Sequence, residues 1–153
     1  MPIFIVVTGV HNSGKTTTIR TLWNNLGGEP LGDGCEVVNM RLIYRGRRIG
    51  FYSLGDNERL LEDLAKGIPH YIEDNCDIIV CAARSYGGTH NYYTRYFIDS
   101  TFYLITKVKI DQEYLNDRLG IAMDLVAEYS EKLIQISNDQ AAEHAKFLID
   151  SFR

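Results

Sequence analysis

The sequence predicts an α/β fold, a three-layer sandwich built on a mainly parallel sheet, and three observations lead to this prediction. Apolar runs at 3–7 and 77–83 are typical of buried strands, helical periodicity follows the first run, and a tight connection near residue 46 permits only an antiparallel hairpin. Strands that alternate with helices favour a sheet with helices on both faces. With 153 residues and 45% apolar content, the chain is expected to form a single domain over 1–153.

The N-terminal elements follow from periodicity and turn chemistry. A strand is expected at 3–7, and a helix at 18–26 because its apolar residues recur on one helical face. Turn-forming residues at 27–34 end that helix. Strands at 36–44 and 48–54 then form the antiparallel hairpin.

Alternation of helix and strand continues through the middle of the chain. A helix is expected from about 57 to 75, with a kink or break near Pro69. The continuous apolar run at 77–83 suits a central parallel strand. Residues 90–98 have a helical pattern, and 101–106 form the last expected strand.

The C-terminal third, about 111–153, is helical in pattern throughout. A second helix is expected to begin at Ser137, where Gln140 completes a capping box. An apolar stripe with steps of four and three residues precedes it. The favoured interpretation is that this stripe packs across the sheet; the alternative is that it forms a coiled-coil-like seam that joins a homodimer.

Charge and cysteine content limit the functional classes. The net charge of −4 disfavours a general nucleic-acid binder, although a local basic patch remains compatible with it. No apolar run reaches the length of a membrane span, and no leader pattern precedes the first strand. The three cysteines have no C-x-x-C spacing and are expected to be reduced thiols. A cytoplasmic protein without a membrane partner is therefore expected.

A glycine-rich motif joins the first strand to the first helix. It runs from Gly9 to Thr16 as G-x-x-x-x-G-K-T. In this pattern backbone N–H groups converge on phosphates, Lys15 reaches the β- and γ-phosphate oxygens, and the Thr16 hydroxyl is a ligand for Mg²⁺. The residues expected to bind the nucleotide are Gly9, Val10, His11, Asn12, Ser13, Gly14, Lys15, Thr16 and Thr17.

Residues 1–26 resemble the strand, Walker A loop and helix of P-loop NTPases. The resemblance implies a P-loop NTPase type of fold and a small ATPase-like or kinase-like domain. It also implies that the chain binds a nucleoside triphosphate together with Mg²⁺.

Hydrolysis or phosphoryl transfer requires an acid on the metal side of the site, and Asp56 is the expected one. It follows the strand at 48–54, whereas Asp77 begins its strand and should lie at the opposite edge of the sheet. Residues 53–57 also resemble the switch segment of GTPases and related ATPases, with Ser53 in the place of the acid. The competing interpretation is that Asp56 caps the helix that follows.

Arg84 is the third candidate catalytic residue, with Lys15 and Asp56. It directly follows the strand at 77–83, where its guanidinium can bind a second anion. The segment from 84 to 90 resembles the arginine-bearing lids of nucleoside and nucleotide kinases, which implies a small phosphorylated or nucleoside acceptor. The alternative is a solvated loop with an incidental arginine.

Two further patterns concern the base and the partners. Thr106 to Lys109 occupies the place of the guanine-reading N/T-K-x-D motif, but Lys109 replaces its carboxylate, so ATP is favoured over GTP. Arg41 and Arg45 are expected to share a face of the hairpin. There they form a cationic strip for a phosphorylated partner, nucleic acid or membrane, or simply a solvated edge.

Three functional classes follow. The preferred one is an Mg²⁺-dependent enzyme that hydrolyses ATP or transfers its γ-phosphoryl group to a small acceptor. The second is a nucleotide-dependent switch whose C-terminal helices meet a protein partner. The third is a nucleotide sensor without catalytic activity.

Overall fold

The structure is a computed structural model that describes most of the chain. The described residues are 2–10, 12–31, 36–54, 67–84, 99–111, 113–118, 120 and 126–152, with the backbone alone described at 116 and 126–129. Expectations for 55–66 and 85–98, which include the helix predicted at 90–98, lie outside these residues.

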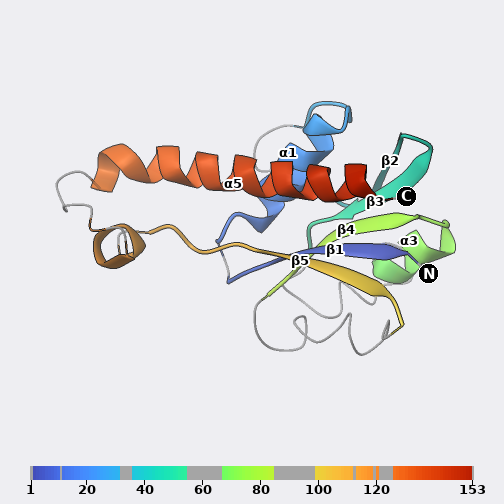
Figure 1. Cartoon of the computed structure of the whole chain (residues 1–153), viewed down its shortest axis with the longest axis horizontal. Helices are drawn as coiled ribbons and strands as arrows, with labels where there is room; N and C mark the ends of the chain where they lie inside the picture. Colours follow the sequence, from blue (N-terminus) through green and yellow to red (C-terminus); the bar gives the residue numbers. More distant parts are fainter. Residues whose placement is uncertain are drawn as a thin grey trace.

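Five strands form one sheet in the order β2-β3-β4-β1-β5 (Figure 1). Their bounds are Ile3–Thr8 (β1), Met40–Tyr44 (β2), Arg47–Tyr52 (β3), Ile78–Ala83 (β4) and Thr101–Thr106 (β5). β1 pairs in parallel with β4 and β5, β3 pairs in parallel with β4, and β2 and β3 form the antiparallel hairpin. The predicted α/β fold with a mainly parallel sheet is confirmed.

The two apolar runs form the centre of the sheet. All six residues of β4 are buried, and five of the six in β1 are. Alternate side chains enter different cores: Ile5 and Val7 belong to one apolar cluster, and Phe4 and Val6 to the other. A strand buried on both faces needs apolar residues at every position, which is why these runs do not alternate with polar residues.

Helices α1 (Lys15–Asn25) and α5 (Val126–Ser151) lie on the same face of the sheet and pack against each other (Figure 1). The buried positions of α5 are mostly alanines, including Ala142 and Ala145 with no exposed surface, and they join the cluster that contains Ile19 and Leu22 of α1. Small side chains allow the two helices to approach closely. The C-terminal part of α5 therefore packs over the sheet.

The N-terminal part of α5 differs from the prediction. Ser137 lies inside one continuous helix of 26 residues, so the helix start predicted there is wrong. The Ser137 hydroxyl accepts a hydrogen bond from Lys107 at 2.5 Å, and the next residue, Asn138, is buried. This part extends beyond the carboxyl ends of the parallel strands (Figure 1), and Ile134 and Ile136 are exposed on it.

The opposite face carries α3 (Ile68–Glu73), so the described helices lie on both faces of the sheet. Gly67 caps α3 in an extended conformation, and Pro69 sits in its first turn, where a missing N–H costs nothing. This agrees with the break expected near Pro69. The Tyr71 ring packs on Gly50, where an added Cβ would lie 2.3 Å from the ring, and the Tyr71 hydroxyl donates to the carbonyl of Phe51.

The arginines of the hairpin do not form the predicted strip. Arg41 pairs with Asp74, after α3, at 2.6 Å, whereas Arg45 pairs with Asp150 of α5 at 3.2 Å. Because these partners come from elements on opposite faces of the sheet, the expectation that both arginines share a face is wrong. Within the described ranges, every helix is too short or too polar to cross a lipid bilayer.

Candidate functional site

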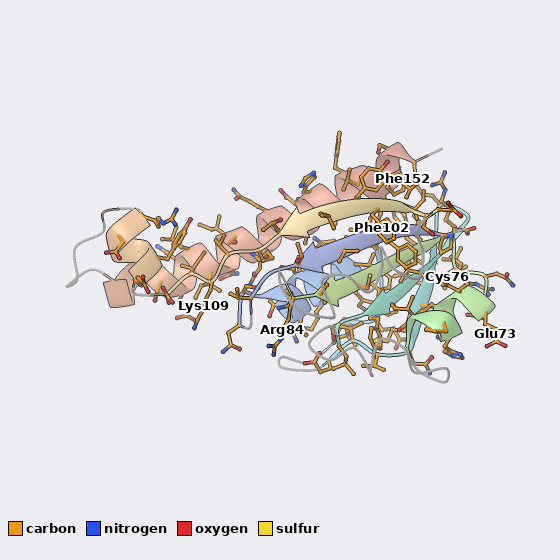
Figure 2. All side chains as sticks on the ribbon, turned by 90° about the horizontal axis from the view of Figure 1, so that it is seen from below. Glu73, Cys76, Arg84, Phe102, Lys109 and Phe152 are labelled. Atoms are coloured by element: carbon orange, nitrogen blue, oxygen red, sulfur yellow. The ribbon has the colours of Figure 1, made fainter. Side chains whose placement is uncertain are left out.

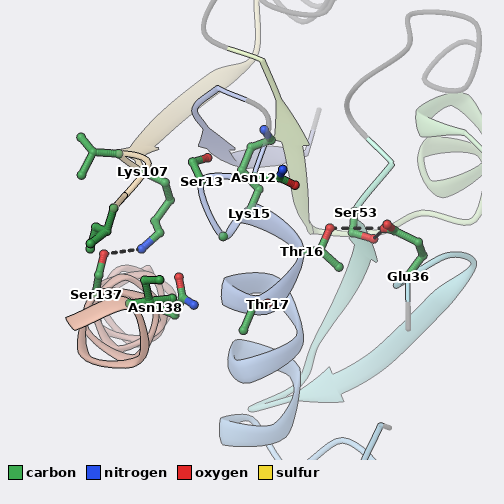
Figure 3. Close-up of a pocket in the computed structure, with 14 residues that line it drawn as sticks. Asn12, Ser13, Lys15, Thr16, Thr17, Glu36, Ser53, Lys107, Ser137 and Asn138 are labelled. Carbon is green, nitrogen blue, oxygen red and sulfur yellow. Dashed lines mark hydrogen bonds between the residues drawn. The ribbon is translucent and has the colours of Figure 1, made fainter. Parts of the chain in front are cut away.

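A pocket of about 370 Å³ opens at the carboxyl ends of the parallel strands (Figure 3). It lies between the Gly9–Thr16 loop, the residues that follow β5, and α5. The lining residues are Asn12, Ser13, Gly14, Lys15, Thr16, Thr17, Glu36, Ser53, Lys107, Val108, Ile110, Ile134, Ser137 and Asn138.

The loop owes its shape to its two glycines. A Cβ on Gly9 would lie 2.6 Å from the carbonyl oxygen of Lys107, so no larger residue fits between β1 and β5 there. Gly14 has a φ of 94°, in the left-handed region that glycine adopts without strain. Directly after it α1 begins at Lys15, and the N–H groups of its first turn have no carbonyl partner within the helix.

The Lys15 ammonium is folded into the loop. It is buried, and its Nζ donates to the carbonyls of Gly9 and Val10, both at 2.9 Å. These neutral carbonyls partly compensate the buried charge but do not neutralise it. The loop thus holds a positive charge at the floor of the pocket.

Ser13 contributes an unsatisfied hydroxyl. Its side chain is only 6% exposed, and its Oγ has no hydrogen-bond partner among the described residues. Leaving a buried hydroxyl unpaired costs about 1–3 kcal/mol, so buried hydroxyls in native structures are paired with the protein, with water or with a ligand. Because Ser13 lines the pocket, its hydroxyl is placed to contact what occupies the pocket.

One carboxylate stands at the far side of the loop. Glu36 Oε2 accepts from the Ser53 hydroxyl at 2.5 Å and from the Thr16 hydroxyl at 3.3 Å (Figure 3). Ser53 is itself fixed because its Oγ accepts from the N–H of Val37 at 2.7 Å. Two hydroxyls and a carboxylate oxygen are the hard oxygen donors that suit Mg²⁺.

Basic residues, and not acidic ones, directly follow the two strands next to β1. Thr8 of β1 is in register with Ala83 of β4 and Thr106 of β5, so the residues that come next are Arg84 and Lys107. Figure 2 shows Arg84 toward the same end of the sheet as Lys109, and Cys76 toward the other end. Together with Lys15, these residues place three basic side chains at this edge of the sheet.

Lys107 is the second buried lysine of the pocket. It is 4% exposed, and its Nζ donates to Ser137 of α5 at 2.5 Å (Figure 3). Burial lowers the pKa of Lys107 because the charged ammonium loses hydration. Asn138, one residue further along α5, accepts at Oδ1 from the hydroxyl of Thr18 at 3.4 Å and sits over Gly14.

The predicted site residues are brought together in part. Asn12, Ser13, Gly14, Lys15, Thr16 and Thr17 all line the pocket, and Gly9 and Val10 hold Lys15. Arg84 is half-buried after β4 but is not among the described residues of the lining. His11 and Asp56 lie outside the described residues.

Sequence reasoning missed Glu36, Lys107, Ser137 and Asn138 as site residues. Lys107 carried a signal, because it stands in the motif compared with N/T-K-x-D, but that comparison concerned the base alone. Asp77 lies at the opposite edge, as expected, where its carboxylate accepts from the N–H of Arg48 at 2.9 Å.

The described residues contain no group of three or more His, Cys, Asp or Glu side chains placed to hold a metal ion. Mg²⁺ at phosphate sites needs fewer, because it is bound by one or two protein oxygens together with phosphate oxygens and water. Thr16, Ser53 and Glu36 meet that requirement.

Searches of protein-family models, of curated proteins and of solved structures find no match to this chain.

Proposed function

We propose that this chain is a P-loop NTPase that binds a nucleoside triphosphate with Mg²⁺ and acts on its γ-phosphoryl group. ATP is the proposed nucleotide, and the reaction is hydrolysis or transfer to a small acceptor. One observation carries the proposal: the G-x-x-x-x-G-K-T loop lines a pocket in which Lys15 is buried and the Ser13 hydroxyl has no partner among the described residues.

Anion binding follows from the loop itself. The first-turn N–H groups of α1 and the positive end of its dipole attract phosphate oxygens. Lys15 exchanges the carbonyls of Gly9 and Val10 for phosphate oxygens, so that its ammonium pairs with charged acceptors in place of neutral ones. The Ser13 hydroxyl gains the hydrogen bond that it lacks.

The metal side of the proposed site consists of Thr16, Ser53 and Glu36. Mg²⁺ at such a site neutralises charge on the phosphates during phosphoryl transfer. Glu36 takes the role that the sequence assigned to Asp56. Ser53 holds the Glu36 carboxylate in place through their hydrogen bond of 2.5 Å.

A turnover experiment tests the enzymatic proposal. Purified protein is incubated with Mg²⁺ and ATP or GTP, alone and with a panel of nucleosides and nucleotides, while phosphate release and transfer are measured. We expect turnover with ATP that is lost in Lys15→Met, which retains the length of the side chain. Absence of release and transfer across the whole panel would contradict the enzymatic proposal.

A nucleotide-dependent switch is the second candidate. The observation that favours it is the bond from Lys107 to Ser137, which links the pocket to α5, whose N-terminal part extends beyond the sheet. A bound nucleotide that alters this bond would move a helix available to a partner. Its signature is a homodimer or partner complex that forms with the ATP state and dissociates with the ADP state.

A further inference from the structure

The outer face of α5 presents large apolar side chains to solvent. Ile136 is 49% exposed, and Phe147 is 71% exposed, the highest value among the large apolar side chains of the described residues. At about 100° per residue the two lie on one face of the helix, about three turns apart. Ala141 and Ala145, which are buried, lie on the other side of the helix. Ile136 and Phe147 therefore face away from the core.

Two polar residues lie between Ile136 and Phe147 on this face. Steps of four, three and four residues lead from Ile136 through Gln140 and Glu143 to Phe147, which is the spacing of the contact positions in a coiled coil. Ile136 also ends the apolar stripe that precedes Ser137. Its exposure means that the stripe points into solvent at this residue, and not onto the sheet. These four residues, from Ile136 to Phe147, are called the seam face below.

A groove of about 460 Å³ lies beside Phe147. Its lining consists of Asn25 from the end of α1 and of Glu143, Lys146, Phe147 and Asp150 from α5. The four residues of α5 have the i, i+3, i+4 and i+7 spacing of a hole that receives one side chain from a facing helix. The Phe147 ring and the methylene stem of Lys146 offer apolar surface there. The groove therefore matches a single apolar side chain of a second helix.

We infer that a second copy of this chain docks on the seam face, with the two α5 helices antiparallel and Ile136 of each copy in the groove beside Phe147 of the other. A two-fold axis relates the copies, so each contact occurs twice. In this register Gln140 of one copy lies level with Glu143 of the other, and its amide donates to the carboxylate. The inference does not depend on the proposed function, because none of these residues is among the described residues that line the nucleotide pocket.

Charged residues on one flank of the seam face support the antiparallel direction. Asp139 and Lys146 lie on the same flank, seven residues apart. Antiparallel helices bring like flanks together, so Asp139 of each copy lies near Lys146 of the other and the charges are complementary. Parallel helices would bring opposite flanks together and place Glu143 against Glu143. The N-terminal part of α5 extends beyond the strands (Figure 1), so it can lie along the second copy.

Charge reversal tests both the partner and the direction, with sedimentation as the measurement. Wild type should form a dimer whose dissociation constant Asp139→Lys raises about tenfold, because two attractions become two repulsions. Lys146→Asp should have the same effect. An equimolar mixture of the two variants should regain the wild-type affinity as a heterodimer, since opposite charges then face each other again. Variants that each lose the dimer, with a mixture that does not restore it, would overturn the antiparallel register.

Phe147→Ala tests the groove. It should raise the dissociation constant about thirtyfold, because each dimer loses two rings, and the exposure of Phe147 allows the fold to tolerate the change. Ile43→Ala is the matched control, because Ile43 is 64% exposed on β2 and its removal should leave the dimer unchanged. A dimer that takes up no MgATP would support this inference and overturn the proposed function. Wild type that stays monomeric at its highest soluble concentration, or a dimer that Phe147→Ala leaves intact, would overturn the inference.

Discussion

Glu36→Gln is the substitution that separates the metal side of the site from the phosphate side. In the structure, Glu36 accepts hydrogen bonds from the Ser53 hydroxyl at 2.5 Å and from the Thr16 hydroxyl at 3.3 Å. A glutamine side chain retains an oxygen that can accept both. The local hydrogen bonds and the fold should therefore survive, while the negative charge is lost. Any change in Mg²⁺ dependence then reports the charge and not the packing.

The expected magnitude follows from the exposure of Glu36. Two unit charges 4 Å apart in water interact by about 1 kcal/mol, so a divalent ion gains about 2 kcal/mol from a carboxylate in a solvated site. This corresponds to about a thirtyfold rise in the Mg²⁺ concentration needed for half-maximal ATP binding. Affinity for ATP without Mg²⁺ should stay the same or increase slightly, because a charge that repels phosphate is gone.

The assay is a titration of Mg²⁺ at a fixed ATP concentration, in which ATP binding is measured by calorimetry or the reaction by turnover. Glu131→Gln is the control, because Glu131 is an exposed residue of α5 and is not among the described residues of the pocket. Asp56→Asn is measured in parallel, since the sequence assigned the acid to that position. An unchanged Mg²⁺ requirement in Glu36→Gln, with a large change in Asp56→Asn, would refute our assignment.

Two further predictions concern the loop and the buried lysine. Gly14→Ala should lower the free energy of unfolding by about 1–2 kcal/mol, because φ is 94° there. It should also abolish the stabilisation of the protein by MgATP in thermal unfolding. A Tm of the variant without ligand equal to that of wild type would contradict the loop geometry. Burial lowers the pKa of Lys107 below 10.5, so the unfolded chain holds that proton more tightly and the folded state gains stability as pH rises toward 10.5. Denaturant unfolding at several pH values measures this effect. Between neutral pH and pH 10.5, the free energy of unfolding of wild type should rise relative to that of Lys107→Met, and a difference between the two proteins that is independent of pH would count against burial of the charge.

The parts of the site that the sequence predicts well are contiguous in the chain. Asn12 to Thr17, which line the pocket, lie within one strand–loop–helix unit, where local rules for glycine and for helix starts apply. The apolar runs of β1 and β4 likewise predict the centre of a parallel sheet, because strands that are buried on both faces are apolar at nearly every position.

The remaining site residues depend on the order of the strands. β4 lies between β1 and β3, so Ser53, which follows β3, is two strands from β1 and its loop. Glu36 reaches Thr16 from the segment before β2. No local pattern reports that a residue 20 positions after Thr16 returns to it. The same holds for Asn138, which meets Thr18 across 120 positions.

The error at Ser137 has a physical origin as well. A serine followed by glutamine three residues later fits a capping box, but such a cap is only one use of a serine hydroxyl. In the folded chain the hydroxyl of Ser137 is engaged by Lys107, and burial of Asn138 and Ala142 continues the helix through the position. Tertiary contacts outweigh the local signal there.

The central claim is that the Gly9–Thr16 loop binds polyphosphate, and calorimetry of MgATP binding to wild type and Lys15→Ala tests it most directly. Lys15 Nζ donates to the carbonyls of Gly9 and Val10 in its own loop, and circular dichroism checks that the variant remains folded. We predict measurable binding to wild type and at least a tenfold loss in Lys15→Ala, as expected when a charge-assisted contact worth about 1.5–3 kcal/mol is removed. Folded wild-type protein that takes up no MgATP, or a Lys15→Ala variant that binds it equally well, would contradict the claim.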